Sequence, residues 1–165
     1  MSMIGKYLRL APAELERALR DPDWAAEHRS ALSGADGLRA AGRLHTTDRA
    51  WHALDFLLSR RSFPVDVVFG EEDLPWPAGH DWGYGPPRLL GAERVRAAVD
   101  ALDDHAPDAL AEGVTPADLA AAKVYPQTAW ERGEEPDWVV AHWAALAPFL
   151  RSAARQGGAL LVWIA

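Results

Sequence analysis

The sequence contains no cysteine, which excludes disulfides, thiol nucleophiles and zinc sites built from thiolates. No stretch approaches the roughly 18 consecutive apolar residues of a membrane-spanning helix. The first residues also lack the basic segment and apolar run of a secretory signal. We therefore expect a cytosolic protein that has no membrane partner.

Basic residues are scarce relative to acidic ones. The chain carries 17 Lys and Arg against 24 Asp and Glu, which gives a formal net charge of -7 at pH 7. Nucleic-acid binding draws on a basic surface that displaces counterions from the phosphate backbone. We therefore expect no nucleic acid among the partners, and a small molecule or a protein instead.

Familiar catalytic and metal-binding signatures are also missing. Among the six histidines, no two have the spacing of a zinc motif, so we expect no metal. Gly83-Tyr84-Gly85 lacks the further glycine and the strand-to-helix setting of a dinucleotide fingerprint, and neither a GxSxG nor a P-loop sequence occurs. We expect no cofactor.

The residues that are present predict one folded domain. Of the 165 residues, 49% are hydrophobic and 25% are charged, values typical of a globular domain. A chain of this length ordinarily forms one domain, which spans residues 1–165. The pattern predicts an α+β fold. It has a small mixed sheet, with strands near 4–10, 65–69, 88–90 and 160–164, and five or six helices packed on it.

Capping signals locate the helices. Asp21 before Pro22 and Thr115 before Pro116 pair a capping side chain with a proline that suits the first turn. Residues 33–45 show no period and predict a loop, after which Thr46 or Thr47 is expected to cap the next helix. Predicted helices begin near residues 12, 21, 48, 92, 116 and 136, and the last of them runs to about 155 with Pro148 inside it.

The C-terminal segment 160–164 is apolar throughout. Such a run is typical of a central strand that is covered on both faces, because a one-sided strand would alternate with polar residues. We therefore place this segment in the interior of the sheet.

The segment 70–87 differs from the rest of the chain. It is rich in glycine and proline, shows no helical or strand period, and carries Trp76, Trp82 and Tyr84. Loops of this length in a compact domain tend to be functional, and large aromatic side chains suit ligand clefts and interfaces. Together with Tyr125 and Trp130 on a second predicted loop, these residues form our leading candidate for a binding site. Core packing of the same side chains is the alternative.

Five segments occur in the order known from one family. They are residues 3–10 with 12–15, 49–54, 83–86, 125–130 and 158–163. Together they resemble the YfbM-like family of bacterial domains of unknown function, over nearly the whole chain. The resemblance implies a compact α+β domain in the bacterial cytosol, and it implies no particular activity.

His52 and Asp55 suggest a second hypothesis. They lie three residues apart on a predicted helix, so their side chains can meet, and a histidine oriented by a carboxylate can act as a general base. A small hydrolase or transferase would use them as catalytic residues. The simpler interpretation is a polar helix face. A third hypothesis, a partner-neutralising protein of the immunity type, is compatible with the acidic charge.

Overall fold

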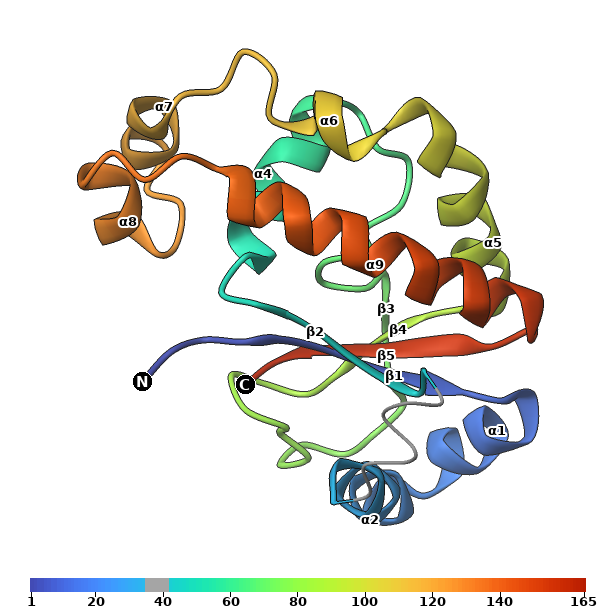
Figure 1. The fold of residues 1–165 in the computed structure, drawn as a ribbon. Coiled ribbons are helices and arrows are strands. Elements are labelled where there is room, and N and C mark those ends of the chain that lie inside the picture. Colours follow the sequence, from blue (N-terminus) through green and yellow to red (C-terminus); the bar gives the residue numbers. More distant parts are fainter. Residues whose placement is uncertain (35–41) are drawn as a thin grey trace.

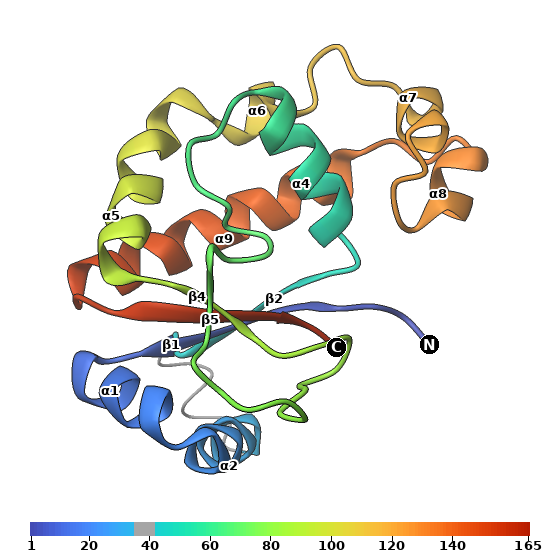
Figure 2. The ribbon, with the colours of Figure 1, turned by 180° about the vertical axis from the view of Figure 1, so that it is seen from behind.

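The computed structural model describes residues 1–34 and 42–165 and has an α+β architecture. Five strands form one sheet: β1 (Gly5–Leu10), β2 (Leu44–Asp48), β3 (Glu72–Asp73), β4 (Arg88–Leu90) and β5 (Ala159–Ile164). Their order in the sheet is β2-β1-β5-β4-β3, and every neighbouring pair is antiparallel. Helices cover both faces of this sheet (Figures 1 and 2). The helices in the described residues are α1 (Pro12–Arg20), α2 (Pro22–Ser33), α4 (Trp51–Arg60), α5 (Ala92–Ala101), the short 3-10 helix η1 (Leu102–Asp104), α6 (Pro107–Leu110), α7 (Pro116–Ala121), α8 (Gln127–Glu131) and α9 (Asp137–Arg155).

β5 is the central strand, which confirms the prediction from its unbroken apolar run. It pairs with β1 on one side and with β4 on the other. Leu160 and Val162 belong to the core on one face, whereas Leu161 and Trp163 belong to the core on the other. Both faces of the strand are therefore buried, and no position on it has to be polar.

The two faces of the sheet carry layers of unequal size. Helices α4 to α9 cover one face, and α1, α2 and the long segment after β3 lie on the other (Figure 1). α9 buries Val139, Trp143, Leu146 and Leu150, which is the face that the sequence predicts. Pro148 lies inside α9 on its exposed side. No helix in the described part of the chain has both the length and the apolar character needed to cross a membrane.

Two predicted caps are present. The Asp21 carboxylate accepts a hydrogen bond from the Trp24 backbone N–H at 3.0 Å, at the start of α2. At the start of α7, the Thr115 hydroxyl accepts from the Asp118 N–H, and the Asp118 carboxylate accepts from the Thr115 N–H. Each cap satisfies a backbone donor that a helix start leaves without a partner.

The predicted strand at residues 65–69 is wrong. This segment forms turns in which the Asp66 carboxylate accepts from the backbone N–H groups of Val68 (3.1 Å) and Phe69 (2.8 Å). These local hydrogen bonds compete with strand pairing, so the valines are buried as part of a turn. The sheet is also antiparallel throughout instead of mixed, and the eight α-helices of the described residues exceed the five or six predicted.

β2 lies where the sequence predicts the end of a loop and a helix cap. Thr46 and Thr47 belong to this edge strand, and α4 begins after Ala50 instead. The Thr46 hydroxyl donates to the Gly5 carbonyl at 2.9 Å, next to a break in the register between β1 and β2. The central part of the predicted 33–45 loop, residues 35–41, lies outside the described residues.

Candidate functional site

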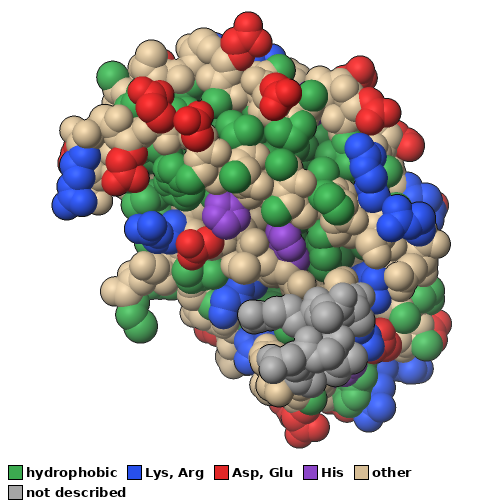
Figure 3. Space-filling model, in the orientation of Figure 1, with side chains coloured by type: hydrophobic (Ala, Val, Ile, Leu, Met, Phe, Trp, Pro, Cys, Tyr) green, Lys and Arg blue, Asp and Glu red, His purple; other side chains and the backbone are tan. Residues whose placement is uncertain are grey.

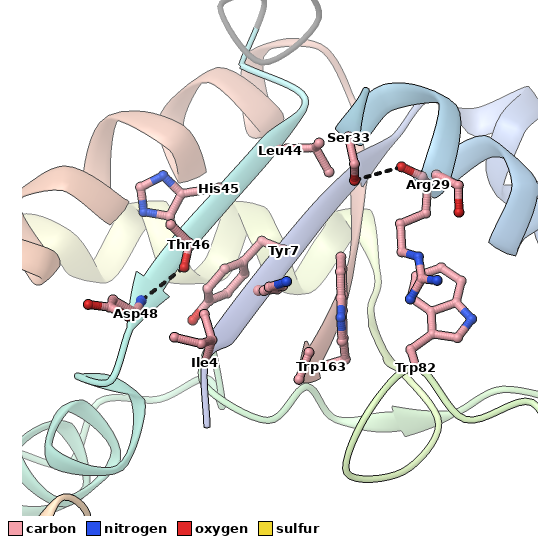
Figure 4. Close-up of a pocket in the computed structure, with 13 residues that line it drawn as sticks. Ile4, Tyr7, Arg29, Ser33, Leu44, His45, Thr46, Asp48, Trp82 and Trp163 are labelled. Carbon is pink, nitrogen blue, oxygen red and sulfur yellow. Dashed lines mark hydrogen bonds between the residues drawn. The ribbon is translucent and has the colours of Figure 1, made fainter. Parts of the chain in front are cut away.

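A large cavity, the main cleft, lies beside the edge of the sheet. It has a volume of about 970 Å³ and is bounded by the end of α2, by β1 and β2, and by the loop that carries Trp82. Figure 4 shows Asp48 at the end of this cleft opposite Arg29 and Trp82. Its lining residues are Ile4, Lys6, Tyr7, Arg29, Ser30, Ser33, Leu44, His45, Thr46, Asp48, Trp82, Trp163 and Ala165.

An arginine stacked on tryptophan forms one wall of the cleft. The Arg29 guanidinium lies over the Trp82 ring, 4.5 Å from the ring centroid, and is 5.9 Å from the centroid of Trp163. The two indoles meet edge to face, with 5.0 Å between their centroids. Because Trp82 is only 6% exposed, it holds Arg29 in place and offers a ligand little surface of its own.

The loop that carries Trp82 is anchored to the small helical layer. Trp76 packs against Trp82 with 5.8 Å between ring centroids, and its indole N–H donates to the Ala18 carbonyl of α1 at 2.8 Å. Gly83 sits against the backbone at the end of β5, where a Cβ would lie 2.4 Å from the Ile164 carbonyl oxygen. These contacts fix the position of Trp82 and, through it, the position of Arg29.

The cleft contains two cations, Arg29 and Lys6, that form no ion pair in the part of the chain that the structure describes, and one acidic side chain, Asp48, at its other end. Neither Arg29 nor Lys6 forms an ion pair or a side-chain hydrogen bond with any described residue. Burial lowers the pKa of Arg29 from its usual value, although an arginine stays charged at neutral pH. A guanidinium with free N–H groups binds carboxylate or phosphate in a bidentate manner.

Three buried polar atoms lie close to the cleft on the α9 side of the sheet. The Tyr7 hydroxyl, the Thr47 hydroxyl and His45 Nε2 have no partner of normal hydrogen-bond geometry among the described residues. Burial raises the pKa of Tyr7, against the effect of the nearby Thr47 hydroxyl. Burial, together with the proximity of His142, lowers the pKa of His45 to about 4. His45 is therefore neutral at pH 7.

The predicted binding residues do not all lie together. Trp82 lines the main cleft, and Trp76 supports it from behind. Tyr84 is 58% exposed and borders a separate groove of about 240 Å³. Tyr125 lines neither cavity: its hydroxyl accepts from the Met3 N–H at 3.0 Å.

The placement of Trp130 on a loop is wrong. It belongs to α8, is 2% exposed, and stacks on Trp138 with 5.4 Å between ring centroids. The helix follows Tyr125-Pro126 directly, and its five residues are too few to show a helical period. Trp130 is a core residue and offers no surface to a ligand.

His52 and Asp55 do not form a dyad. His52 Nδ1 accepts the Tyr125 backbone N–H at 2.9 Å, and no hydrogen bond or ion pair joins His52 to Asp55 in the described residues. Asp55 instead lines a small cavity of about 150 Å³ with Asp66. Burial raises the pKa of Asp55, Asp66 raises it further, and His52 opposes the rise. The polar helix face is the better interpretation of this pair.

Sequence reasoning missed the two residues that give the cleft its charge. Arg29 falls on the helix 21–32 and Lys6 on the first strand, and neither belongs to a motif. Only the fold brings Arg29 over Trp82. Within residues 1–34 and 42–165, no three His, Cys, Asp or Glu side chains converge as a metal site would require.

The comparisons with known proteins define the family. Residues 1–163 match the model of the domain of unknown function DUF1877, and the chain belongs to this family. Its fold is similar to the crystal structure of YfbM from Escherichia coli, a protein of unknown function, with a TM-score of 0.67 and 20% sequence identity. The match covers 98% of this chain and 99% of YfbM. No curated protein matches the chain.

At 20% sequence identity, the likeness to YfbM shows a shared fold and nothing more. It agrees with the resemblance seen in the five sequence segments. Neither the family description nor the YfbM structure names a ligand, a partner or a reaction.

Proposed function

We propose that this chain is a binding protein whose ligand is a small organic anion held in the main cleft by Arg29 and Lys6. The observation that carries the proposal is the Arg29 guanidinium, which is stacked 4.5 Å above Trp82 and has no acceptor among the described residues. Binding is favoured over catalysis because His52 Nδ1 is occupied by a backbone N–H.

The physical basis is a preorganised cation. Stacking on Trp82 reduces the rotamer freedom that an arginine side chain would otherwise lose when it binds a ligand. A hydrogen bond to a charged group contributes about 1.5–3 kcal/mol. The flanking Ser30, Ser33 and Thr46 supply hydroxyls, and Leu44 supplies apolar surface. This combination suits a carboxylate or phosphate attached to an apolar or aromatic body.

The acidic surface does not argue against an anionic ligand. Acidic side chains gather over the helical layer that includes α6 and α7, on the upper part of the face drawn in Figure 3. Charges that are farther apart than about 8–10 Å are largely screened at physiological ionic strength. Within the cleft, the two cations outnumber Asp48, the one acidic side chain among its described lining residues, so its local charge favours an anion.

The test is a fluorescence titration with 8-anilinonaphthalene-1-sulfonate, an aromatic anion. We expect Arg29→Gln to weaken its binding about tenfold, the equivalent of about 1.4 kcal/mol. Arg17→Gln is the matched control, because Arg17 lies 4.7 Å over the Trp24 ring but does not line the cleft. Benzoate should displace the dye, whereas benzamide, a neutral molecule of similar shape, should not.

Several outcomes would contradict the proposal. The wild type would not bind the dye, or Arg29→Gln and Arg17→Gln would reduce affinity equally, or benzamide would displace the dye as well as benzoate. Melting temperatures of both variants distinguish a loss of the cation from a loss of structure.

A protein partner is the second candidate, and Tyr84 favours it. This is a large exposed aromatic residue, and the adjoining groove has Met3, Phe69 and Pro86 on its walls. Interfaces are enriched in tyrosine, which offers apolar area and a hydroxyl. Tyr84→Ser should leave dye binding in the cleft unchanged and would reduce only the binding of such a partner.

A further inference from the structure

Arg9 is a buried cation on the opposite face of β1 from Lys6. The residue is 9% exposed. Its one side-chain hydrogen bond to a described residue is a long contact of 3.5 Å from Nη1 to the Ser152 hydroxyl. No described carboxylate lies within ion-pair distance. Buried charges are ordinarily paired, so this arrangement requires an explanation.

The Arg9 side chain reaches a polar cavity of about 220 Å³. A water molecule occupies about 30 Å³ of liquid volume, so the cavity has room for an ion of several heavy atoms. The cavity is lined by Arg9, Ala11, Glu14, Arg43, Gln156 and Gly158.

Gly158 has no side chain, and this leaves room for the side chain of Arg9. A Cβ at this position would lie 3.1 Å from Arg9 Cγ and 3.3 Å from the Leu10 carbonyl oxygen. Any larger residue would press on the stem of Arg9. The backbone of the α9–β5 turn is therefore shaped around the arginine that lines the cavity.

Glu14, the one carboxylate among the described residues that line this cavity, is already engaged. Glu14 pairs with Arg43, accepts from the Ala11 backbone N–H at 2.9 Å, and lies 2.9 Å from His28 Nε2. Burial would raise the pKa of Glu14, but its hydrogen bonds from Ala11 and Arg43 hold the pKa below its usual value. Glu14 therefore pairs with Arg43. Its charge also favours the Arg9 cation, but Arg9 forms no ion pair with Glu14 or any other described carboxylate.

Helix α1 adds to the positive potential. It has nine residues and begins at Pro12, so its N-terminal end faces the cavity at Ala11. The helix dipole favours an anion at this end. Burial lowers the pKa of His28 from its usual value, so its ring is neutral at pH 7, and the charged side chains that line the cavity are Arg9, Arg43 and Glu14.

We infer that this cavity binds a small oxyanion of the phosphate or sulfate type through the Arg9 guanidinium, with Arg43 at its edge. The cavity shares no lining residue with the main cleft, so this inference stands apart from the proposed function. The oxyanion is either a free ion or the terminal group of a phosphomonoester, since both present the same tetrahedral oxygens.

The test is thermal unfolding in low-millimolar sodium phosphate, compared with sodium chloride at equal ionic strength. Low concentrations keep the general stabilising effect of phosphate on proteins small. We expect a saturable rise of about 4 °C for the wild type at about ten times the dissociation constant. Arg9→Gln should abolish the rise. Arg151→Gln, which removes a partly exposed arginine paired with Asp103 at 3.4 Å and outside the cavity lining, should retain it.

A second variant covers the case in which Arg9→Gln does not fold. Gln156→Glu puts a carboxylate at the exposed edge of the cavity, where it can neutralise Arg9, and we expect it to lose most of the phosphate response. Phenyl phosphate distinguishes the two sources of the anion: an equal response indicates a phosphomonoester, and a response to inorganic phosphate alone indicates the free ion. The inference is overturned if chloride stabilises the wild type as much as phosphate, or if a folded Arg9→Gln or Gln156→Glu variant keeps the full response.

Discussion

Replacing Trp82 by alanine is expected to weaken both the fold and anion binding. The indole is 6% exposed and packs edge to face on Trp163. A buried aromatic side chain removes about 150–250 Å² from water, which at about 25 cal/mol per Å² corresponds to roughly 4–6 kcal/mol. The extended-chain reference overstates this burial, so we expect a loss of about 3–5 kcal/mol, the range seen for aromatic-to-alanine changes in cores.

The assay is urea unfolding followed by far-ultraviolet circular dichroism. With a slope of about 2 kcal/mol per M, the midpoint should fall by about 1.5–2.5 M. Dye affinity measured without urea should fall as well, because Arg29 loses the surface on which it is stacked. Tyr84→Ala is the control, since a side chain that is 58% exposed should change stability by no more than about 0.5 kcal/mol.

The result that would refute this reasoning is specific. If Trp82→Ala moved the midpoint by less than about 0.5 M, the indole would contribute little to the core. If stability fell but dye affinity stayed at the wild-type value, Trp82 would be a core residue only, and the link from the loop to Arg29 would be wrong.

Three further predictions concern other parts of the molecule. Asp55→Asn should stabilise the protein at pH 7, because the pKa of Asp55 is raised in the fold and its ionised form costs stability; urea unfolding should show the gain shrinking as the pH falls and Asp55 becomes protonated. His45→Phe should make the free energy of unfolding depend less on pH in the acid range, because a histidine whose pKa is lowered from 6.5 to about 4 in the fold contributes stability that is complete above pH 6.5 and is lost as the pH falls towards 4. A variant that loses as much stability in acid as the wild type would contradict this. Deleting residues 160–165 should abolish soluble expression, because it removes the central strand, and a truncated protein that melted cooperatively near the parent temperature would refute that role.

Sequence patterns predicted the elements whose defining features lie within their own residues: an unbroken apolar run, a capping side chain or a buried helical stripe. β5 could be predicted because burial on both faces leaves an unbroken apolar run. The caps at Asp21 and Thr115 could be predicted because the capping side chain and the donor are close in sequence. The long helix α9 showed its buried stripe over several turns.

The remaining elements depend on contacts that no local pattern contains. β2 is an edge strand with mainly polar residues, and it is held by pairing with β1 across a register break. The valines at 65–69 match a strand, but the Asp66 carboxylate stabilises turns instead. The candidate site could be predicted only in part. The aromatic loop indicated Trp82, but Arg29 could not be predicted because it reaches Trp82 only through the packing of α2.

The distribution of charge connects the two proposed sites. The chain has 24 acidic residues, enough to pair every arginine, and Arg43, Arg88 and Arg94 do pair with carboxylates. Arg29 and Arg9 are at least half withdrawn from solvent and have no such partner among the described residues. Leaving a partly buried cation unpaired costs free energy, and a bound anion would recover it. The two arginines line different cavities, so the same physical argument makes separate predictions that separate variants can test.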